Sequence, residues 1–259
     1  MSEIHNTALI GKNVILGDNI AIGPYCIIED GVKIGNNNTV YASVYMTGNT
    51  DIGNDNKFFP FSSIGSVPQD LKYKGENSKL IIGNKNTFRE HVTINPGTSG
   101  DNMLTLIGNS SLFMVGAHIA HDCIVGNHVI MANQATLGGH VQIDNNAVLG
   151  GISAVHQFCK IGKLAMIGGL SAVENDVIPF GLALGNRAKL TGVNIVGLKR
   201  ANYSKGTIRE YANTVNKIFN GKTIKSETEK IKASNNDLVE ELLVFLNKDS
   251  SRGLCKYEK

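Results

Sequence analysis

The sequence has no tryptophan, only 5 prolines among 259 residues and no long apolar run. A membrane-spanning helix needs about 18 or more consecutive apolar residues, and no segment of this chain offers them. The chain does not open with a charged segment followed by an apolar one, as a signal peptide does. From these absences we expect a cytoplasmic protein without a membrane span.

Signals for nucleotide and nucleic-acid binding are also missing. The sequence contains neither a phosphate-binding G-x-x-x-x-G-K-[ST] loop nor the G-x-G-x-x-G fingerprint of dinucleotide-binding domains. Its basic residues are not interleaved with aromatic ones, although single-stranded nucleic acids bind by stacking on aromatic side chains. We therefore expect no nucleic-acid partner.

A six-residue period of apolar residues runs through most of the chain. One register covers residues 4–64 without a polar member, a second covers residues 82–94, and a third covers residues 107–173. Four residues after each position of the third register the side chain is small or slim, as at Ala117 and Cys123. One bulky and one small residue in every six is typical of a hexapeptide β-solenoid, in which three hexads form a triangular coil of about 18 residues.

The cysteines follow the same pattern. Cys26, Cys123 and Cys159 occupy the small inward position, so we expect buried, inert thiols. Cys123 and Cys159 lie two coils apart, about 9–10 Å at the spacing of strands, which exceeds the reach of a disulfide. Cys255 lies outside the repeats and is the candidate for a reactive thiol.

The repeats end near residue 179, and we predict a β-helix over residues 1–185 and a helical domain over residues 186–259. The second part carries 15 Lys and Arg against 8 Asp and Glu, whereas the first carries 10 against 14. Apolar residues at helical spacing predict helices over residues 204–220 and 237–248. The basic charge is either a solvated helix surface or a docking surface for an acidic protein or for phosphates.

Two segments, near residues 66–80 and 95–106, break the six-residue register. Insertions in a solenoid leave the prism as external loops, where binding and catalytic residues often lie. The first insertion carries Asp70 and Lys72, a carboxylate and an ammonium two residues apart. This spacing alone fits either a solvated loop or a binding site.

All seven histidines lie outside the inward positions of the hexads, so we expect none in the core. Asp122 precedes His140 by 18 residues, one coil, and His121 precedes Gly139 by the same number. We therefore expect these four residues to stack as one outer patch. Four histidines fall within 39 residues: His118, His121, His140 and His156.

Three interpretations of the histidine patch remain open on spacing alone. A neutral imidazole can accept a proton near pH 7 and act as a general base. Hexapeptide solenoids also include zinc-dependent carbonic anhydrases with three histidines at a subunit interface. Their usual histidine pair is separated by four residues, whereas His118 and His121 are separated by two. The third interpretation is a solvated surface.

Longer motifs resemble those of the acyl-[acyl-carrier-protein]–UDP-N-acetylglucosamine O-acyltransferases, the family that opens lipid A biosynthesis. The resemblance covers nearly the whole chain and implies a left-handed parallel β-helix followed by a small α-helical C-terminal domain. It also implies a homotrimer with active sites in the clefts between subunits. The matching segments are GAHIAHDC at residues 116–123, QDLKY at 69–73, AVHQFC at 154–159, GVNI at 192–195 and GLKR at 197–200.

The resemblance assigns the catalytic roles to three residues. His121 is the general base that takes the proton from the sugar 3-hydroxyl, which then attacks the thioester of a (R)-3-hydroxyacyl carrier protein. Asp122 orients the imidazole. The Gly139 N–H binds the oxyanion of the tetrahedral intermediate. This chemistry needs no metal, no cofactor and no covalent acyl-enzyme.

The resemblance also implies the binding residues. Gly169 is expected to leave the acyl groove open to long chains, around fourteen carbons. Val196 and Ala201 differ from the Glu and Arg of the family members that we know best, so no ligand contact is transferred to them. A 3-amino analogue of the sugar remains an alternative acceptor. The residues expected to contact the acceptor or the donor are Asp70, Lys72, His118, His140, His156, Gln157, Asn194 and Arg200.

Overall fold

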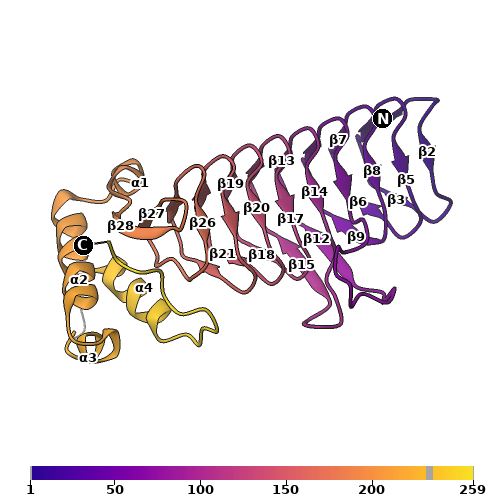
Figure 1. Ribbon diagram of the computed structural model, residues 1–259. Coiled ribbons are helices and arrows are strands. Elements are labelled where there is room, and N and C mark those ends of the chain that lie inside the picture. The colour runs from indigo at the N-terminus through magenta and orange to yellow at the C-terminus, as the bar shows by residue number, and fades with distance from the viewer. Residues whose placement is uncertain (1, 232–235, 259) are drawn as a thin grey trace.

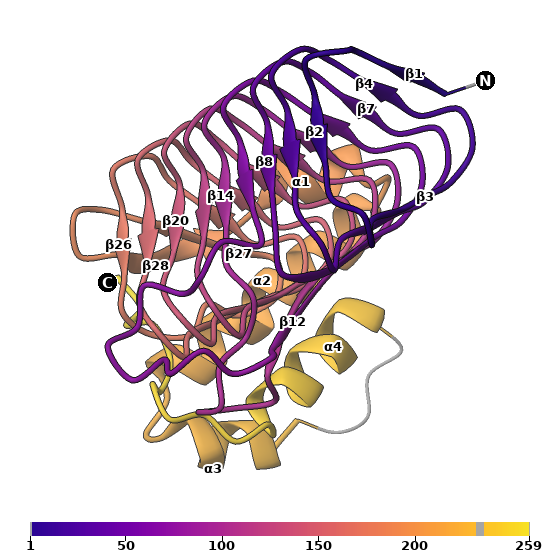
Figure 2. The ribbon, with the colours of Figure 1, turned by 90° about the vertical axis from the view of Figure 1, so that its right-hand side faces the viewer.

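The computed structural model describes residues 2–231 and 236–258 and has the form of a long prism with helices at one end (Figure 1). Three sheets of stacked, mostly parallel strands form the walls of the prism. Figure 2 shows the coils one behind the other, with the N-terminal coils in front and the helices behind. A parallel β-helix followed by helices was predicted from the sequence, and this arrangement is confirmed.

Each coil adds one short strand to each wall. Sheet A contains β1 (Glu3–Ile4), β4 (Ala21–Ile22), β7 (Thr39–Val40), β10 (Lys57–Phe58), β13 (Thr87–Phe88), β16 (Leu112–Phe113), β19 (Ile130–Met131), β22 (Val148–Leu149), β25 (Met166–Ile167), β27 (Gly181–Leu184) and the antiparallel β28 (Lys189–Val193). Sheet B contains β2 (Leu9–Ile10), β5 (Ile27–Ile28), β8 (Tyr45–Met46), β11 (Ser63–Ile64), β14 (Thr93–Ile94), β17 (His118–Ile119), β20 (Thr136–Leu137), β23 (Ala154–Val155) and β26 (Ala172–Val173). Sheet C contains β3 (Ile15–Leu16), β6 (Lys33–Ile34), β9 (Asn49–Ile52), β12 (Lys79–Ile82), β15 (Leu104–Ile107), β18 (Ile124–Val125), β21 (Gln142–Ile143) and β24 (Lys160–Ile161).

The core is a column of apolar side chains that stack from coil to coil. Phe58, Phe88 and Phe113 are partners in sheet A, and their rings stack with centroids 4.9 Å apart at both steps. These partners are 30 and 25 residues apart instead of 18, because the two insertions leave the prism between them. The inward residues therefore stay stacked across the two insertions, as the resumption of the six-residue period after each insertion predicted.

At most corners of the prism the backbone is left-handed at the third residue after the bulky inward residue of the hexad, the anchor. Most residues with positive φ are not glycines, and the β-branched Ile152 has a φ of 57°. The glycines that follow anchors serve a different purpose. A Cβ on Gly35 would lie 2.5 Å from Asn54 Oδ1 and 2.8 Å from Gly53 O, so glycine permits the coils to stack closely. Most corners therefore adopt the left-handed backbone without glycine, the residue that does so most easily.

Within the ranges that the structure describes, four helices follow the prism: α1 (Ile195–Arg200), α2 (Lys205–Asn220), α3 (Ile224–Glu229) and α4 (Asp237–Leu246). Each begins after a side chain that accepts a hydrogen bond from a first-turn N–H, as Ser204 does for α2. The α2 helix docks on the prism through Tyr211, which is fully buried and donates a hydrogen bond to Pro179 O. The chain end returns to the prism, where Leu254 pairs with Asp176.

Three details differ from the predictions. Ile4 is 44% exposed because no coil covers the first one. The prism continues past residue 179, since β27 extends sheet A as a further parallel strand. Cys255 is 3% exposed and its Sγ lies against Ala188 O, and burial raises the pKa of this thiol to about 11. Cys255, the candidate for a reactive thiol, is therefore buried like the other three cysteines, because the tail packs back onto the prism.

Within residues 2–231 and 236–258 there is no helix with the length and apolar character that crossing a membrane requires.

Candidate active site

The histidine patch lies along the corner between sheets B and C. The short turns that follow β17, β20 and β23 stack there, because each of these strands pairs with the next in the parallel register. His140 N donates to His121 O at 3.0 Å, and Phe158 N donates to Gly139 O at 3.1 Å. The predicted stacking of His121 with Gly139 and of Asp122 with His140 is therefore confirmed.

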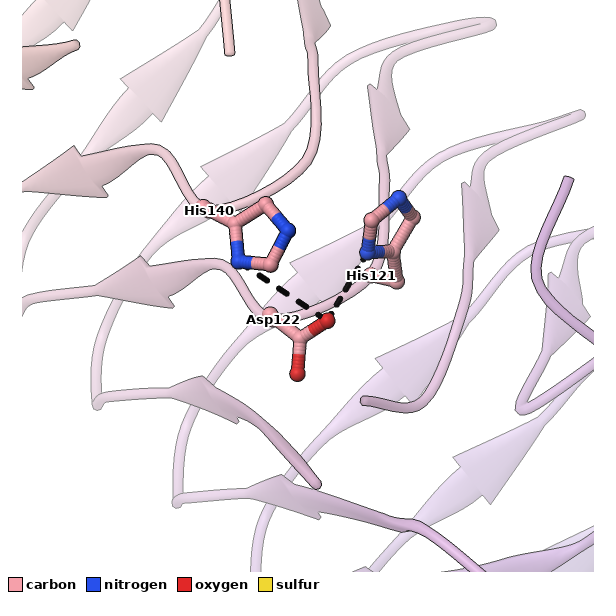
Figure 3. A group of neighbouring side chains, drawn as sticks. All are labelled: His121, Asp122 and His140. Carbon is pink, nitrogen blue, oxygen red and sulfur yellow. Dashed lines mark hydrogen bonds and ion pairs between the residues drawn. The ribbon is translucent and has the colours of Figure 1, made fainter. Parts of the chain in front are cut away.

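His121 and Asp122 form a buried hydrogen-bonded pair (Figure 3). His121 Nδ1 lies 2.8 Å from Asp122 Oδ2, and the two residues are 7% and 4% exposed. With a proton on Nδ1 donated to the carboxylate, the lone pair is on Nε2. This is the arrangement of an imidazole that can accept a proton from a substrate hydroxyl. No histidine lies among the inward core residues, as expected, although His121 is buried at this corner, where Thr98 of the second insertion bonds the neighbouring Asp122.

His140 lies beside this pair and has four contacts. Its ring meets the His121 ring edge to face, with centroids 5.0 Å apart, and stacks on Phe158 with centroids 4.3 Å apart. His140 Nδ1 lies 3.1 Å from Asp101 Oδ2. It also lies 3.9 Å from Asp122 Oδ2 (Figure 3). The ring is thus fixed by packing on one side and by carboxylates on the other.

His121, Asp122 and His140 offer three possible metal-ligand atoms within 4.8 Å of one another. The Asp122 carboxylate, however, already accepts three hydrogen-bond donors, two from Thr98 and one from His121. A metal ion would have to displace at least one of these bonds. The hydrogen bonds around Asp122 therefore fit a His–Asp pair better than a metal centre.

Gly139 borders the His121 imidazole. A Cβ at this position would lie 2.5 Å from His121 Cε1 and 2.6 Å from His121 Nε2, closer than any real contact. In the described part of the chain, the Gly139 N–H has no hydrogen-bond acceptor. Glycine thus makes room for the base and leaves one backbone donor next to it.

The remaining predicted residues of this corner lie around the pair. His118 Nδ1 is 2.7 Å from Thr93 Oγ1, and burial, with a smaller effect of His121, lowers the pKa of His118 below its ordinary value. His118 is therefore a neutral hydrogen-bonding group near pH 7. His156 and Gln157 belong to the coil after that of His140 and are exposed. Both are contacted by Arg252, which donates to His156 Nδ1 and to Gln157 O.

Asp70 and Lys72 lie in the first external loop, where Lys72 N donates to Asp70 Oδ1 at 2.9 Å. Among the residues that the structure describes, no hydrogen bond or ion pair joins either side chain to His118, His121, His140 or His156. The loop is joined to the second one by Glu76, whose carboxylate accepts from Ser99 N at 3.0 Å and from Lys74 N at 2.7 Å. These bonds lower the pKa of Glu76 to about 2.

Asn194 and Arg200 lie on a different wall. They line a cavity of about 850 Å³ on the outer face of sheet A, beside the apolar side chains of Ile130, Val148 and Met166. Asn194 caps α1, since its Oδ1 accepts from Gly197 N at 2.9 Å. Sheet A is the wall opposite the corner of the histidines, so one chain does not bring these two residues to His121.

Gly169 lies at the corner between sheets A and B, directly after β25. A Cβ there would lie 3.3 Å from Gly151 O, a tight contact but not a clash, and the residue does not have a positive φ. The left-handed residue of this turn is Leu170, with a φ of 59°, and it is 70% exposed. The turn therefore does not itself require glycine at position 169.

Four residues of this region were not predicted from the sequence. Phe158 lies 18 residues after His140, so the stacking rule could have identified it. Thr98 and Asp101 lie in the second insertion, where no repeat register exists. Arg252 arrives from the end of the chain. The contacts of Thr98, Asp101 and Arg252 could not be predicted from the spacing of residues in the sequence.

Comparisons with known proteins identify the family. Residues 176–255 match the family model described as "Udp N-acetylglucosamine O-acyltransferase; Domain 2", and residues 105–139 match the model of bacterial transferase hexapeptide repeats. An acyl-[acyl-carrier-protein]–UDP-N-acetylglucosamine O-acyltransferase of Rickettsia peacockii is 46% identical over 100% of this chain and 99% of its own length. The chain belongs to this acyltransferase family. A second member, from Aliarcobacter butzleri, is 44% identical over 95% of both chains.

Solved structures of the acyltransferase family agree with this assignment. The UDP-N-acetylglucosamine acyltransferase of Francisella novicida superposes with a TM-score of 0.94 at 33% identity and covers 98% of this chain and 94% of its own. The corresponding enzyme of Campylobacter jejuni gives a TM-score of 0.92 at 35% identity and covers 99% of this chain and 100% of its own. The predicted left-handed β-helix and the family resemblance are confirmed, and the carbonic-anhydrase interpretation is not favoured.

Proposed function

We propose that this acyltransferase works by general-base catalysis, with His121 as the base. It transfers a (R)-3-hydroxyacyl chain from acyl carrier protein to the 3-hydroxyl of UDP-N-acetylglucosamine, the first step of lipid A biosynthesis. His121 Nε2 takes the hydroxyl proton as the oxygen attacks the thioester carbonyl, and the proton then passes to the departing thiolate. The observation that carries this proposal is the buried bond of 2.8 Å between His121 Nδ1 and Asp122.

Asp122 and Gly139 complete the proposed chemistry. The Asp122 carboxylate keeps the proton on Nδ1 and stabilises the imidazolium that forms during the reaction. The Gly139 N–H, which has no acceptor among the described residues, donates to the oxyanion of the tetrahedral intermediate. The oxygen nucleophile comes from the acceptor itself, so the mechanism needs no metal, no cofactor and no acyl-enzyme.

The active enzyme is proposed to be a homotrimer whose sites lie between subunits. Asn194 and Arg200 face away from the histidine corner of their own chain, because they line the cavity on sheet A. A second copy that places its sheet A against this corner would bring both residues to the base. In that site Asp70, Lys72 and the residues around the base contact the sugar and the nucleotide, and Asn194 and Arg200 bind the donor arm or the nucleotide. The residues around the base with this role are His118, His140, His156 and Gln157.

The donor is proposed to bind through charge and apolar contact. Acyl carrier proteins are acidic, and residues 186–259 carry the net positive charge of the chain. The cavity on sheet A is lined by Ile130, Val148 and Met166 and offers an apolar surface for the acyl chain. Gly169 lies on the same side of the prism, at the corner that ends this wall, and acts as the ruler of chain length.

The domain boundary and the cellular location of the protein are also proposals. We place the division of the chain between residues 185 and 186, and we expect the protein in the cytoplasm, where both substrates are expected. The family model that begins at residue 176 supports a separate C-terminal unit.

The function is tested by incubating the purified protein with UDP-N-acetylglucosamine and a panel of hydroxyacyl carrier proteins. Mass spectrometry of the product should show the acceptor with one ester-linked hydroxyacyl chain. A preference for the 3-amino analogue of the sugar, with an amide product, would contradict the proposed acceptor. No product with either acceptor would contradict catalysis itself.

A further inference from the structure

The second external loop closes over the carboxylate that holds the base. Thr98 N lies 2.9 Å from Asp122 Oδ1 and 3.1 Å from Oδ2, and Thr98 Oγ1 donates to Oδ2 at 2.6 Å. Thr98 is 3% exposed and Asp122 is 4% exposed. One residue of an insertion thus supplies two donors to the carboxylate that accepts the proton of His121 Nδ1.

The position of Thr98 is fixed on both sides. A Cβ on Gly97 would lie 2.0 Å from Leu104 N and 2.8 Å from Asp122 Oδ1, so glycine permits the loop to pass close to β15 and to the carboxylate. On the other side, Ser99 N donates to the Glu76 carboxylate of the first loop at 3.0 Å. Thr98 therefore lies in a short segment that is held at both neighbours.

A buried carboxylate has a large desolvation cost that only hydrogen bonds or opposite charges can offset. The groups that face Asp122 are Thr98, His121 and, at 3.9 Å, His140 Nδ1. Hydrogen bonds to an ionised group are among the strongest in proteins. Because Thr98 Oγ1 and His121 Nδ1 both bond Oδ2, the hydroxyl, together with the Thr98 N–H, holds the carboxylate in the rotation that aims Oδ2 at the imidazole.

We propose that Thr98 is a positioning residue for the base, the third member of a Thr98–Asp122–His121 chain of hydrogen bonds. The proposal rests on the role of His121 as general base. Thr98 acts on the reaction only through the orientation of Asp122, and it contacts neither substrate.

Thr98→Val tests this role because it keeps the shape of the side chain and the backbone N–H but removes the hydroxyl. The free energy of a hydrogen bond to a charged group corresponds to about a tenfold to hundredfold change in rate. We therefore expect kcat to fall by about tenfold or more. The KM for the acceptor should stay within about twofold, because the lost interaction acts on the transition state. Thr98→Ser restores the hydroxyl and should return most of the activity.

Two controls separate positioning from folding and from the base proposal. Thr39→Val, on β7 of another wall, should leave kcat and melting temperature unchanged. In a His121→Ala background, Thr98→Val should cause no further loss, because residues that act as one unit are not additive.

Three results would overturn the role of Thr98. They are a Thr98→Val enzyme with wild-type kcat beside an impaired His121→Ala enzyme, a rise in KM with kcat unchanged, and a Ser variant as impaired as the Val variant. A His121→Ala enzyme with wild-type turnover would instead overturn the base itself, and the proposal for Thr98 with it.

Discussion

Gly139→Ala is the substitution whose effect the geometry predicts most directly. The added Cβ would lie 2.5 Å from His121 Cε1 and 2.6 Å from Nε2, whereas ordinary contacts of such atoms are about 3.4–4 Å. The imidazole must therefore move by about 1 Å. A misplacement of this size costs about a hundredfold in rate, or about 2.7 kcal/mol of transition-state stabilisation.

The assay is the steady-state release of the carrier-protein thiol, measured with the melting temperature of each variant. Gly139→Ala keeps the backbone N–H, so a loss of kcat reports the displaced base and not a deleted donor. Gly206→Ala is the control, because its Cβ would meet only Ser204 Oγ at 3.6 Å, and it should behave as wild type. A Gly139→Ala enzyme with more than about a third of wild-type kcat would refute the reasoning.

Three further predictions address metal, donor docking and chain length. Exhaustive chelation should leave activity intact and elemental analysis should find well under one zinc per chain, whereas stoichiometric zinc lost together with activity would favour a metalloenzyme. Donor affinity should weaken clearly between low salt and about 0.5 M salt, where the Debye length is roughly 4–5 Å, and Lys199→Glu with Arg200→Glu should reproduce that loss. Indifference to both changes would place docking elsewhere. Gly169→Met should lower activity on long hydroxyacyl donors and spare short ones, because a bulky side chain at this position would close the end of the proposed acyl groove. The backbone tolerates the added Cβ, which would lie 3.3 Å from Gly151 O. Equal loss on all donors together with lower stability would contradict the role of Gly169 in setting chain length.

The repeat explains why so much of the fold could be predicted. In a solenoid a residue's neighbour in space is one period away in the sequence, so the step of 18 residues sufficed to place Asp122 under His140 and His121 beside Gly139. The same arithmetic could have identified Phe158. In such a chain, contacts between coils can be predicted once the period is known, because each repeat contacts only its neighbours.

The remaining features depend on segments that have no period. Thr98 bonds Asp122 and Asp101 bonds His140 because an insertion folds back over the corner, and this path leaves no spacing signal. The burial of His121 could not be predicted either, because the residue does not occupy an inward position of its hexad. Cys255 is buried because the chain end pairs with the prism, so its reactivity could not be derived from the sequence around it.

His121→Ala measures the central claim most directly. Since a positioned general base contributes about 10²–10⁴-fold, turnover should fall by at least about a hundredfold, with the melting temperature and the oligomeric state nearly unchanged. His5→Ala, an exposed histidine near the start of the prism, should retain wild-type turnover. A His121→Ala enzyme that keeps more than about a third of wild-type turnover would show that another group takes the proton and would contradict the account.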